Sequence, residues 1–194
     1  MRAADGAHAA DAADAADAAA VRRVVAAAFG DERPLLVRLL DELDRTERVV
    51  ASLVAEVDGA VVGHVQLSRS WVDARERLVE VVVLSPLSVH PDVQRTGVGS
   101  ALLAAAVEVA RAAAEPAVFL EGSPAYYGER GWQRASSLGF TRPSARIPDA
   151  AFQVVLLVDD LPRGALVYCD AFWALDCVGL RDPFLAEIEE RFAD

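Results

Sequence analysis

The most constraining feature of this chain is an apolar run that passes through a glycine-containing turn into an alanine-rich segment. The run RLVEVVVLSPLSV covers residues 77–89, and the turn HPDVQRTGVGS after it contains Gly97 and Gly99. A long run of β-branched and apolar residues is typical of a strand that is buried on both faces. The sequence after the turn predicts a helix from about Ser100 to Ala114. We therefore expect a central strand that leads directly into a helix N-terminus.

This turn has the properties of an anion-binding loop. The first N–H groups of an α-helix have no intrahelical partner, and they point away from the helix N-terminus. The helix dipole adds partial positive charge there, which stabilises an anion by ~0.3 to 1 kcal/mol at an exposed site. Gly97 and Gly99 let the main chain approach a ligand and adopt dihedral angles that other residues avoid. With Arg95 and the Ser100 hydroxyl as further donors, the pattern predicts a site for a pyrophosphate group.

Two well-known phosphate-binding loops do not fit this sequence. All 19 basic residues are arginine, so the chain cannot supply the lysine of the Walker loop G-x-x-x-x-G-K-[ST]. The absence of lysine also excludes Schiff-base chemistry on a lysine side chain. A dinucleotide-binding fingerprint would need glycine or alanine where this chain has Leu102, and it would open a parallel βαβ unit.

Two helices are predicted before the first strand. The segment HAADAADAADAAAVRRVVAAAFG contains an alanine and aspartate repeat, in which Asp11, Asp14 or Asp17 could cap or complement a helix N-terminus. We expect this helix to be frayed at its start and regular from Val21. After Gly30, the run ERPLLVRLLDEL has leucines at helical spacing and predicts a second amphipathic helix.

The rest of the sequence alternates strand and helix patterns. Asp58 and Gly59 join two β-rich runs and predict an antiparallel hairpin. After the alanine-rich helix, PAVFLEG predicts a short buried strand, SPAYYGERGW a short helix or turn, and FQVVLLV and GALVYCDAFW two late strands. These elements predict a mixed α/β (α+β) domain with one main sheet. The last segment, DPFLAEIEERFAD, predicts a helix whose apolar face covers either the sheet edge or a partner subunit.

Length and composition predict the domain organisation and the compartment. A length of 194 residues with 54% hydrophobic residues favours one domain with a sizeable core. We expect a low-complexity segment at 1–20, the main domain at 21–175 and a helical extension at 176–194. No apolar run approaches the ~18 residues that a membrane span needs, so we expect no membrane association and a cytoplasmic location.

Charge and cysteine usage narrow the classes of partner. The net charge of −11 argues against nucleic acid and mildly favours a cationic small molecule or peptide. Cys169 and Cys177 have no zinc-ligand spacing, so we predict no metal site and interpret both as buried free thiols.

The glycine-containing turn resembles the acetyl-CoA signature of the GNAT N-acetyltransferase family. The signature Q/R-x-x-G-x-G/A is matched by Gln94, Arg95, Thr96, Gly97, Val98 and Gly99. The order of predicted elements is also similar to that of the family over roughly Val21 to Trp173. The combination of PLSVHPDVQRTGVGSALL, GSPAYYGERGW and FQVVLLV most resembles a YhbS-like branch of the family. The resemblance implies the GNAT fold, in which helices flank a central mixed and mostly antiparallel sheet.

The resemblance also implies acetyl-CoA as co-substrate and the residues that hold it. Main-chain groups of Leu87, Ser88 and Val89 would hydrogen-bond the pantetheine arm as a neighbouring strand does. Main-chain amides of the loop would surround the pyrophosphate. The loop residues assigned to this role are Gln94, Arg95, Thr96, Gly97, Val98, Gly99 and Ser100.

By the same resemblance, Tyr127 is the proton donor. In the family a tyrosine often lies before a glycine and aromatic pair, which here is Gly131 and Trp132. A positioned phenol can donate a proton or a hydrogen bond to the departing CoA thiolate. A packed core tyrosine with a satisfied hydroxyl is the alternative interpretation of Tyr127. The neighbouring Tyr126 is less well placed for the role.

The sequence does not identify the general base or the first strand of the family. Glu80 on the central strand and Glu121 at the end of the next strand are candidates, because a carboxylate or a water that it holds can take a proton from an ammonium group. Each is interpreted first as an ordinary surface or capping carboxylate, and we name neither as catalytic. The segment MRAADGAHAADA has no β-rich run that would correspond to the family's first strand.

Other polar and aromatic residues receive a structural interpretation. His64 and His90 are expected to have structural roles within a strand and at a strand exit. Arg130 and Arg134 would either meet the 3′-phosphate of CoA or lie on a solvated face. The tryptophans expected in the core or in pocket walls are Trp71, Trp132 and Trp173.

These observations together predict an N-acetyltransferase that moves an acetyl group from acetyl-CoA to a primary amine by direct attack. The expected acceptor is an amine-bearing small molecule or peptide, and a homodimer is an open alternative to a monomer. Two other functions stay open: a noncatalytic acyl-CoA-binding regulatory module, and an acyltransferase that uses a longer acyl-CoA. Tyr127 favours turnover, whereas the loop would be kept in all three cases.

Overall fold

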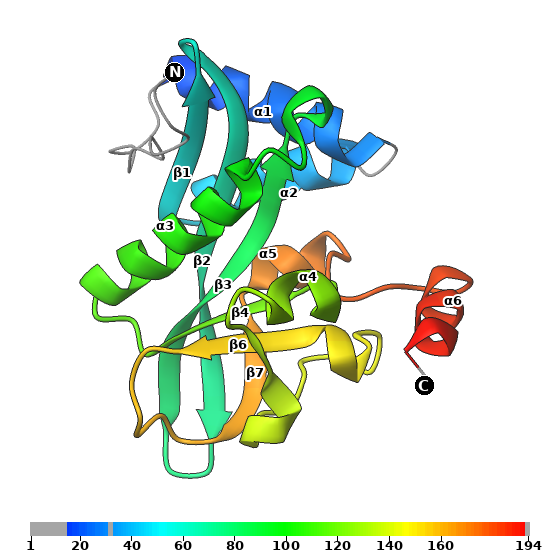
Figure 1. Cartoon of the computed structure of the whole chain (residues 1–194). Helices are drawn as coiled ribbons and strands as arrows, with labels where there is room; N and C mark the ends of the chain where they lie inside the picture. Colours follow the sequence, from blue (N-terminus) through cyan, green and yellow to red (C-terminus); the bar gives the residue numbers. More distant parts are fainter. Residues whose placement is uncertain (1–14, 31–32, 193–194) are drawn as a thin grey trace. The chain divides into compact units, whose positions relative to one another are not determined.

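The computed structural model describes residues 15–30 and 33–192 (Figure 1). The described helices are α1 Ala15–Phe29, α2 Arg33–Arg45, α3 Val98–Ala112, α4 Pro124–Gly128, α5 Asp170–Ala174 and α6 Phe184–Arg191. The described strands are β1 Val49–Val57, β2 Ala60–Ala74, β3 Leu78–Val89, β4 Ala117–Glu121, β5 Gln133–Arg134, β6 Phe152–Leu156 and β7 Gly164–Tyr168. Three short 3-10 helices are η2 Pro91–Val93, η3 Ala135–Leu138 and η4 Asp149–Ala151.

The helices that precede the sheet form where the sequence predicts them. α1 has Asp17 in its first turn, where a negative charge complements the helix dipole, and it already begins before Val21. The proposed caps Asp11 and Asp14 lie outside the described residues, as does the segment in which the family's first strand was sought. Among the described residues, none of the helices is long and apolar enough to cross a membrane.

One late strand is shorter than the sequence pattern predicts. The run GALVYCDAFW was expected to form one strand, but β7 ends at Tyr168 and Asp170 begins α5. Asp170 lies in the first turn of α5, where a carboxylate is favourable, and the helical turn buries both Ala171 and Phe172. An alternating strand pattern would have placed these two adjacent residues on opposite faces, so the helix buries more apolar surface.

The strands form one mixed sheet in the order β1-β2-β3-β4-β6-β5, with β7 paired to β2. The pairs β1–β2, β2–β7, β4–β6 and β5–β6 are antiparallel. The pair β3–β4 is parallel and joins Val82 to Val118 and Val83 to Phe119. The predicted mixed and mostly antiparallel sheet flanked by helices is therefore confirmed.

The chain divides into two compact units, and each is described by itself. The first unit comprises the described residues of Met1–Ser68 together with Leu84–Ala114. In this unit Val57 pairs with Ala60 across the predicted hairpin turn. At that turn Asp58 and Gly59 have φ angles of 51° and 78°, which two-residue hairpin turns with positive φ require.

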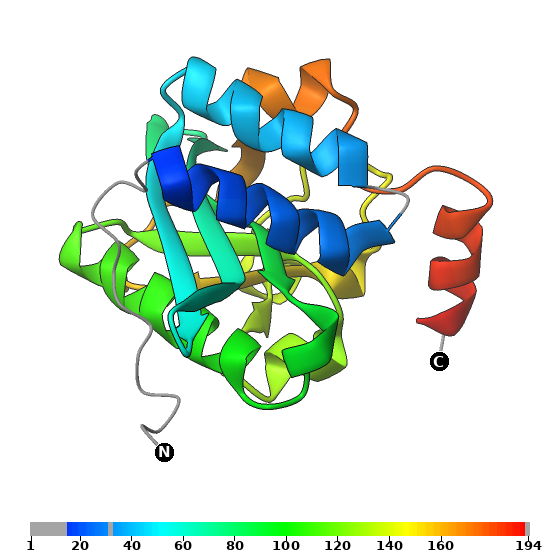
Figure 2. The same cartoon turned by 90° about the horizontal axis from the view of Figure 1, so that it is seen from above.

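Helices cover both faces of the β1–β2 hairpin in the first unit (Figure 2). On one face, a cluster of α1, α2 and β1 residues buries Val21, Val25, Leu40 and Val54. On the other face α3 approaches so closely that a Cβ atom on Gly63 would lie 2.9 Å from Leu102 Cδ1. This close approach fixes the start of α3 against the sheet, and with it the turn that precedes α3.

The second unit comprises Arg69–Val83 and the described residues of Glu115–Asp194. Its core contains Phe119 of β4, whose ring centroid lies 5.1 Å from Phe140 in an edge-to-face pair and 5.8 Å from a stacked Phe152. Such aromatic pairs add to the burial of their apolar surface. The core therefore sets the position of β4, which ends at Glu121.

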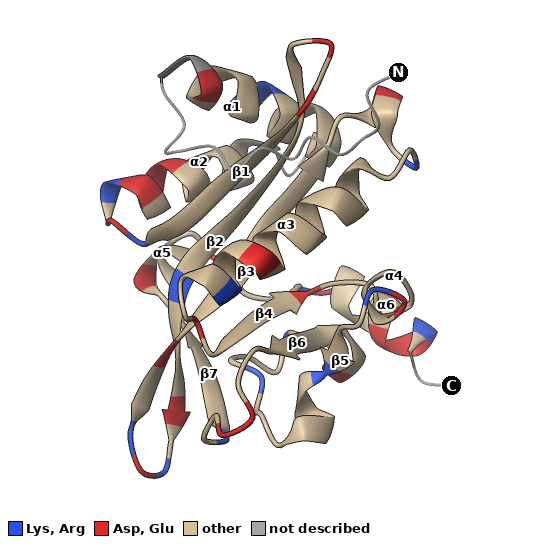
Figure 3. Ribbon diagram, turned by 60° about the vertical axis from the view of Figure 1, so that its left-hand side comes forward, with Lys and Arg blue, Asp and Glu red and all other residues tan. Residues whose placement is uncertain are grey.

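Helix α6 contrasts with this core because none of its residues is buried. Phe184 at its start is 65% exposed. Red segments in Figure 3 mark acidic residues on α6 and on α2, and blue segments mark arginines at the β2–β3 turn. The predicted C-terminal helix is present, and the limits 21–175 and 176–194 for domain and extension stay a prediction.

Candidate functional site

The turn between β3 and α3 leaves the α3 N-terminus uncapped by a side chain. Gly97 is the N-cap residue, with φ 99° and ψ −10°, and it makes no side-chain cap hydrogen bond. This left-handed conformation is accessible to glycine and strained for most other residues, as the sequence predicts for this position. Gly99 lies inside α3, which begins at Val98, two residues before the expected start. The first N–H groups of α3 are therefore donors for which Gly97 supplies no acceptor.

Hydrogen bonds within the turn hold its shape. The Gln94 side-chain Nε2 donates to the main-chain oxygen of Val89 at 3.1 Å, which ties the turn to the end of β3. The Thr96 hydroxyl donates to the main-chain oxygen of Val93 at 2.6 Å. Two of the predicted cofactor-binding side chains thus bind main-chain oxygens of the same loop. Their contribution is to the shape of the loop, and main-chain groups remain to meet a ligand.

The turn is open to solvent along most of its length. Gln94, Arg95, Thr96 and Gly97 are exposed, whereas Val98 is buried and anchors the helix start. Arg95 has a φ of 62°, so a non-glycine residue adopts the left-handed region at the centre of the turn. Such a conformation costs about 1 kcal/mol and persists only where the surroundings determine it.

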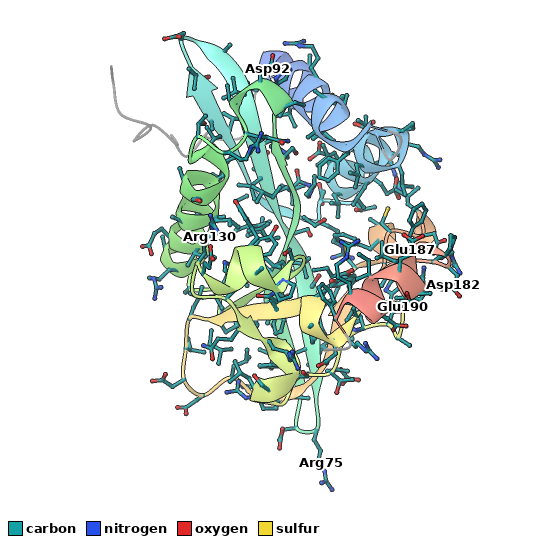
Figure 4. The ribbon with its side chains drawn as sticks, turned by 45° about the vertical axis from the view of Figure 1, so that its right-hand side comes forward. Arg75, Asp92, Arg130, Asp182, Glu187 and Glu190 are labelled. Atoms are coloured by element: carbon teal, nitrogen blue, oxygen red, sulfur yellow. The ribbon has the colours of Figure 1, made fainter. Side chains whose placement is uncertain are left out.

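The neighbouring η2 helix places an imidazole beside an exposed carboxylate. His90 Nδ1 is the cap acceptor for the Asp92 N–H at a long 3.4 Å, and it lies 3.6 Å from Asp92 Oδ2. Asp92 lies on the outside of the turn (Figure 4). These contacts agree with the structural role that the sequence suggests for His90.

The end of β3 contains a buried hydroxyl for which the described residues supply no hydrogen-bond partner. Ser88 is 1% exposed, and its Oγ has no hydrogen bond within the described part of the chain. Leu87 and Val89 on either side are partly exposed. The N–H of His90 donates to the oxygen of Val62 at 2.8 Å, which fixes the strand exit against β2. A buried polar atom of this kind usually has a water or a ligand as partner.

In the second unit, a short helix after β4 positions Tyr127. α4 begins with Pro124 after Ser123, whose hydroxyl accepts a long 3.5 Å hydrogen bond from the Tyr126 N–H. The Tyr127 ring makes edge-to-face contacts with Tyr126 at 5.0 Å and with the buried Trp132 at 5.9 Å between centroids. The expectation that Trp132 is a core residue is confirmed.

Gly122 gives the Tyr127 ring its place. A Cβ atom added to Gly122 would lie 2.1 Å from Tyr127 Cε2, a distance that real Cβ atoms do not show. The ring therefore lies directly against the main chain that follows β4. Sequence reasoning missed Gly122, because a glycine at a strand end has many ordinary explanations.

The Tyr127 phenol keeps its proton at neutral pH. Burial raises the pKa of Tyr127 to about 12, with a smaller contribution from Tyr126, while the charge of Arg130 opposes the shift. The described residues provide no hydrogen-bond partner for the Tyr127 hydroxyl. The hydroxyl is thus a protonated donor at neutral pH, and its role as an acid stays a prediction.

Tyr126 has a different environment from its neighbour. The guanidinium of Arg130, two residues after the end of α4 (Figure 4), stacks 3.8 Å from the Tyr126 ring centroid and also donates to the Tyr126 main-chain oxygen. Arg130 lies 3.8 Å from Glu129, and Arg134 lies 3.7 Å from Asp149. Both arginines therefore have carboxylate neighbours of their own.

The two candidate carboxylates differ in their surroundings. Glu80 has a side chain that is 68% exposed and lies 3.6 Å from Arg69, which agrees with an ordinary surface carboxylate. Glu121 is largely enclosed and accepts a hydrogen bond from the Tyr168 hydroxyl at 2.7 Å. Burial raises the pKa of Glu121 to about 7. No sequence signal relates Glu121 to Tyr168, because they lie on different strands far apart in the chain.

The other singled-out residues are mostly structural. His64 is buried, contacts Ser52 Oγ at 3.0 Å, and has its pKa lowered to about 4 by burial, so its imidazole is neutral. Trp71 is partly buried. Trp173 is 44% exposed, so it is not a core residue, because α5 buries Ala171 and Phe172 and leaves Trp173 outside. A place in a pocket wall stays a prediction for Trp173.

The two cysteines lie in different environments. Cys169 is buried as expected, whereas Cys177 is only partly buried. Both are free thiols. Among the described residues, no group of three or more histidine, cysteine and acidic side chains is placed to hold a metal ion.

The chain is similar to known proteins in sequence and in fold. A model described as the acetyltransferase (GNAT) family matches residues 18–132. The chain is 32% identical over 126 residues to the uncharacterised N-acetyltransferase YjhQ of Escherichia coli K12, which covers 63% of this chain and 68% of that protein.

Two solved structures are similar over most of the chain. A GNAT acetyltransferase from Brucella melitensis in complex with acetyl-CoA has a TM-score of 0.68 and 28% identity, and the match covers 82% of this chain and 94% of that one. The GNAT acetyltransferase YhbS from E. coli in complex with CoA has a TM-score of 0.74 and 23% identity, covering 82% and 88%. At 23% identity the likeness to YhbS concerns the fold.

Proposed function

Because this chain belongs to the GNAT family of acetyltransferases, we propose that it transfers an acetyl group from acetyl-CoA to a primary amine. The observation that carries the proposal is the α3 N-terminus, where Gly97 adopts a left-handed conformation and supplies no side-chain cap. An uncapped helix N-terminus after a strand suits a pyrophosphate group. The proposed acceptor is an amine-bearing small molecule or peptide, and the proposed location is the cytoplasm.

The residues of the first unit suit the CoA part of the co-substrate. Main-chain amides from Arg95 to Ser100 would meet the pyrophosphate, and exposure of the turn gives them access to it. The described pairing of β3 with β4 ends at Val83. The main-chain groups of Leu87–Val89 can therefore hydrogen-bond another extended partner on that edge of β3. The pantetheine arm, with its two amide groups, is such a partner. The acetyl-CoA complex of the Brucella relative supports this assignment.

Tyr127 suits the chemical step. Transfer of the acetyl group breaks the C–S bond and leaves a thiolate, which a positioned acid stabilises by giving up a proton. Tyr127 has the required proton at neutral pH, because burial raises its pKa to about 12. Its hydroxyl has no competing acceptor among the described residues. In the proposed reaction Tyr127 therefore donates to the departing sulfur.

Two measurements test the proposed function. Calorimetric titration of the full chain with CoA should show binding, and acetyl-CoA with a panel of amines should release free CoA. The panel includes spermidine, glucosamine, an aminoglycoside, a peptide with a free N-terminus and a lysine-containing peptide with a blocked N-terminus. Binding of CoA without release with any amine would support the noncatalytic regulatory module instead. Release only from a longer acyl-CoA would change the donor but keep the enzyme class.

A further inference from the structure

Three arginines line an open hollow in the second unit. The hollow has a volume of about 600 Å³ and is lined by Arg75, Glu76, Arg77, Pro162 and Arg163. The first three residues form part of the turn between β2 and β3, and the other two precede β7. All three arginines are exposed. This arginine hollow therefore gathers three guanidinium groups from two segments of the chain, against the single carboxylate of Glu76.

The three guanidinium groups form no ion pair within the described part of the chain. Arg163 donates to the main-chain oxygen of Leu161 at 2.8 Å and stacks 4.8 Å from the ring centroid of Phe140, so its position is held by neutral groups. The positive charge of Arg75 and Arg77 at the turn has no described carboxylate within 4 Å. On a chain with a net charge of −11, such a cluster suits an acidic partner.

Helix α6, in the same unit, has the complementary charge. Residues 182–191 contain four carboxylates and a single arginine. None of the α6 residues is buried, so these carboxylates are free to meet a partner surface. Figure 4 labels three of the acidic residues on this segment, and Figure 3 shows the acidic segments of α6 in red. The four carboxylates are those of Asp182, Glu187, Glu189 and Glu190.

The same helix also has an apolar face. Phe184, Leu185 and Ile188 lie at positions i, i+1 and i+4, which helical periodicity places on one side of α6. Phe184 is 65% exposed, and the other two are only partly buried. Leu78, which follows Arg77 in the chain, is 58% exposed and offers an apolar contact beside the arginine hollow. The two surfaces therefore match in apolar character as well as in charge.

The chain that leads into α6 is tied to another part of the second unit. The Arg181 Nε donates to Asp176 Oδ2 at 2.7 Å, and the Leu180 N–H donates to the main-chain oxygen of Arg146 at 2.9 Å. Figure 4 shows Arg75 at the tip of the β2–β3 turn, well separated from the labelled carboxylates of α6. The arginine hollow of the same chain is thus not the surface that α6 meets, and a second copy can bring the two together.

We propose that α6 of one copy docks its acidic and apolar face in the arginine hollow of a second copy. Because each chain carries both surfaces, a two-fold dimer makes this contact twice. A helix of eight residues is only about 12 Å long, whereas a stable interface buries about 800 Å² on each partner. Two reciprocal contacts are therefore needed, and the dimer should be weak and sensitive to salt.

Sedimentation velocity of the full chain measures the association. Between about 1 and about 100 μM, the mass should rise from that of one copy, 20.7 kDa, toward that of two copies. The rise should be larger at about 50 mM salt than at about 500 mM salt, because salt screens exposed charges. A chain that stays a single copy at the highest concentration and the lowest salt would overturn the proposal. Docking of α6 within its own chain would give this result.

An exchange of charge tests which surfaces meet. Arg75→Glu with Arg77→Glu reverses the hollow, and Glu187→Arg with Glu190→Arg reverses the helix. Each double variant alone should associate with itself at least about tenfold more weakly than the wild-type chain, because like charges then face each other. An equimolar mixture of the two double variants should recover the dimer, since opposite charges meet at both contacts. A mixture that stays as single copies would overturn the proposed pairing.

Two further variants separate the contact from general effects of charge and folding. Arg23→Glu with Arg38→Glu makes the same change of net charge at exposed arginines of α1 and α2, and it should keep the dimer dissociation constant within about twofold. Phe184→Ala should weaken the dimer about tenfold and leave the fold intact, because Phe184 is exposed. Equal losses in the control and in the reversed hollow, or an unchanged dimer in Phe184→Ala, would contradict docking through α6.

Discussion

The turn before α3 and the end of β4 differ in how they are built. The turn is contiguous, exposed and made of main-chain donors, and its side chains Gln94 and Thr96 bind main-chain oxygens within the loop. The end of β4 is enclosed and made of side chains that come from β4, α4 and β7. A site made of main-chain groups depends on dihedral angles, and a site made of side chains depends on tertiary packing. The turn before α3 therefore tolerates no bulky residue at Gly97. The end of β4 can be disrupted by substitutions in any of the segments that pack there.

The largest effect is expected from Gly97→Val, which attacks the main-chain site. Valine at φ 99° is strained and would displace the donors at the α3 N-terminus, so CoA affinity should fall about 100-fold or more. Calorimetric titration measures the change. Gly59→Val is the matched control, because Gly59 also has positive φ and open space but lies at the β1–β2 turn. Equal losses of affinity in both variants would mean that strain, and not the loop, is responsible.

The next effect is expected from Tyr127→Phe, which attacks the side-chain site. Removal of the phenol proton should reduce turnover about 10²-fold and leave CoA affinity within about twofold. Steady-state kinetics with acetyl-CoA and calorimetry with CoA separate the two quantities. A variant with wild-type kcat would move the acid role to water or another residue.

The third prediction concerns stability, and it gives the two units opposite pH dependence. The pKa of Glu121 is raised from 4.5 to about 7, so its contribution to the free energy of unfolding is present below pH 4.5 and lost as the pH rises through 7. The pKa of His64 is lowered from 6.5 to about 4, so its contribution is present above pH 6.5 and lost as the pH falls through 4.

Chemical denaturation of Glu121→Gln tests this prediction. Between pH 4.5 and pH 7 the wild-type chain should lose on the order of 2 kcal/mol of its free energy of unfolding through Glu121, and the variant should not. Glu80→Gln, with an exposed carboxylate, should retain the wild-type slope over the same range. A wild-type slope in Glu121→Gln would show that the carboxyl titrates at its ordinary pKa.

The smallest effect is expected from Gly122→Ala, which tests how the end of β4 positions the Tyr127 ring. The added methyl group would displace the Tyr127 ring, and turnover should fall about tenfold because misplacement of an acid by a fraction of an ångström weakens proton transfer. Kinetics at saturating acetyl-CoA measure the loss. Gly128→Ala is the control, since a Cβ atom at Gly128, in the helix α4 that carries Tyr127, meets nothing within 4 Å. Equal rates in the two variants would contradict a positioning role for Gly122.

The difference between the two regions explains what the sequence predicts well. The strand, turn and helix around Gly97 are readable because their requirements are local: β-branched residues, a positive φ and alanine-rich helix sequence lie next to one another. The hairpin at Asp58 and Gly59 is predicted for the same reason. The family motif adds the ligand to this local information.

What the sequence does not reveal depends on contacts between distant segments. Glu121 meets Tyr168 and Gly179 only after β4, β7 and the following loop have packed together, and their spacing in the chain follows no pattern. The end of β7 is missed for a related reason. Residues with β propensity continue past Tyr168 in the sequence, and only the burial of Ala171 and Phe172 favours a helix there.

The hydrogen bond from Gln94 to Val89 has a consequence for the thermodynamics of ligand capture. It closes the turn into a ring with the strand end, so the loop loses its conformational freedom when the chain folds and not when a ligand arrives. Binding at this turn should then carry little unfavourable configurational entropy. If Gln94 is replaced by a side chain that cannot reach Val89, the loop should be more flexible before a ligand binds. The affinity should then be weaker, and the loss should lie in the entropy of binding.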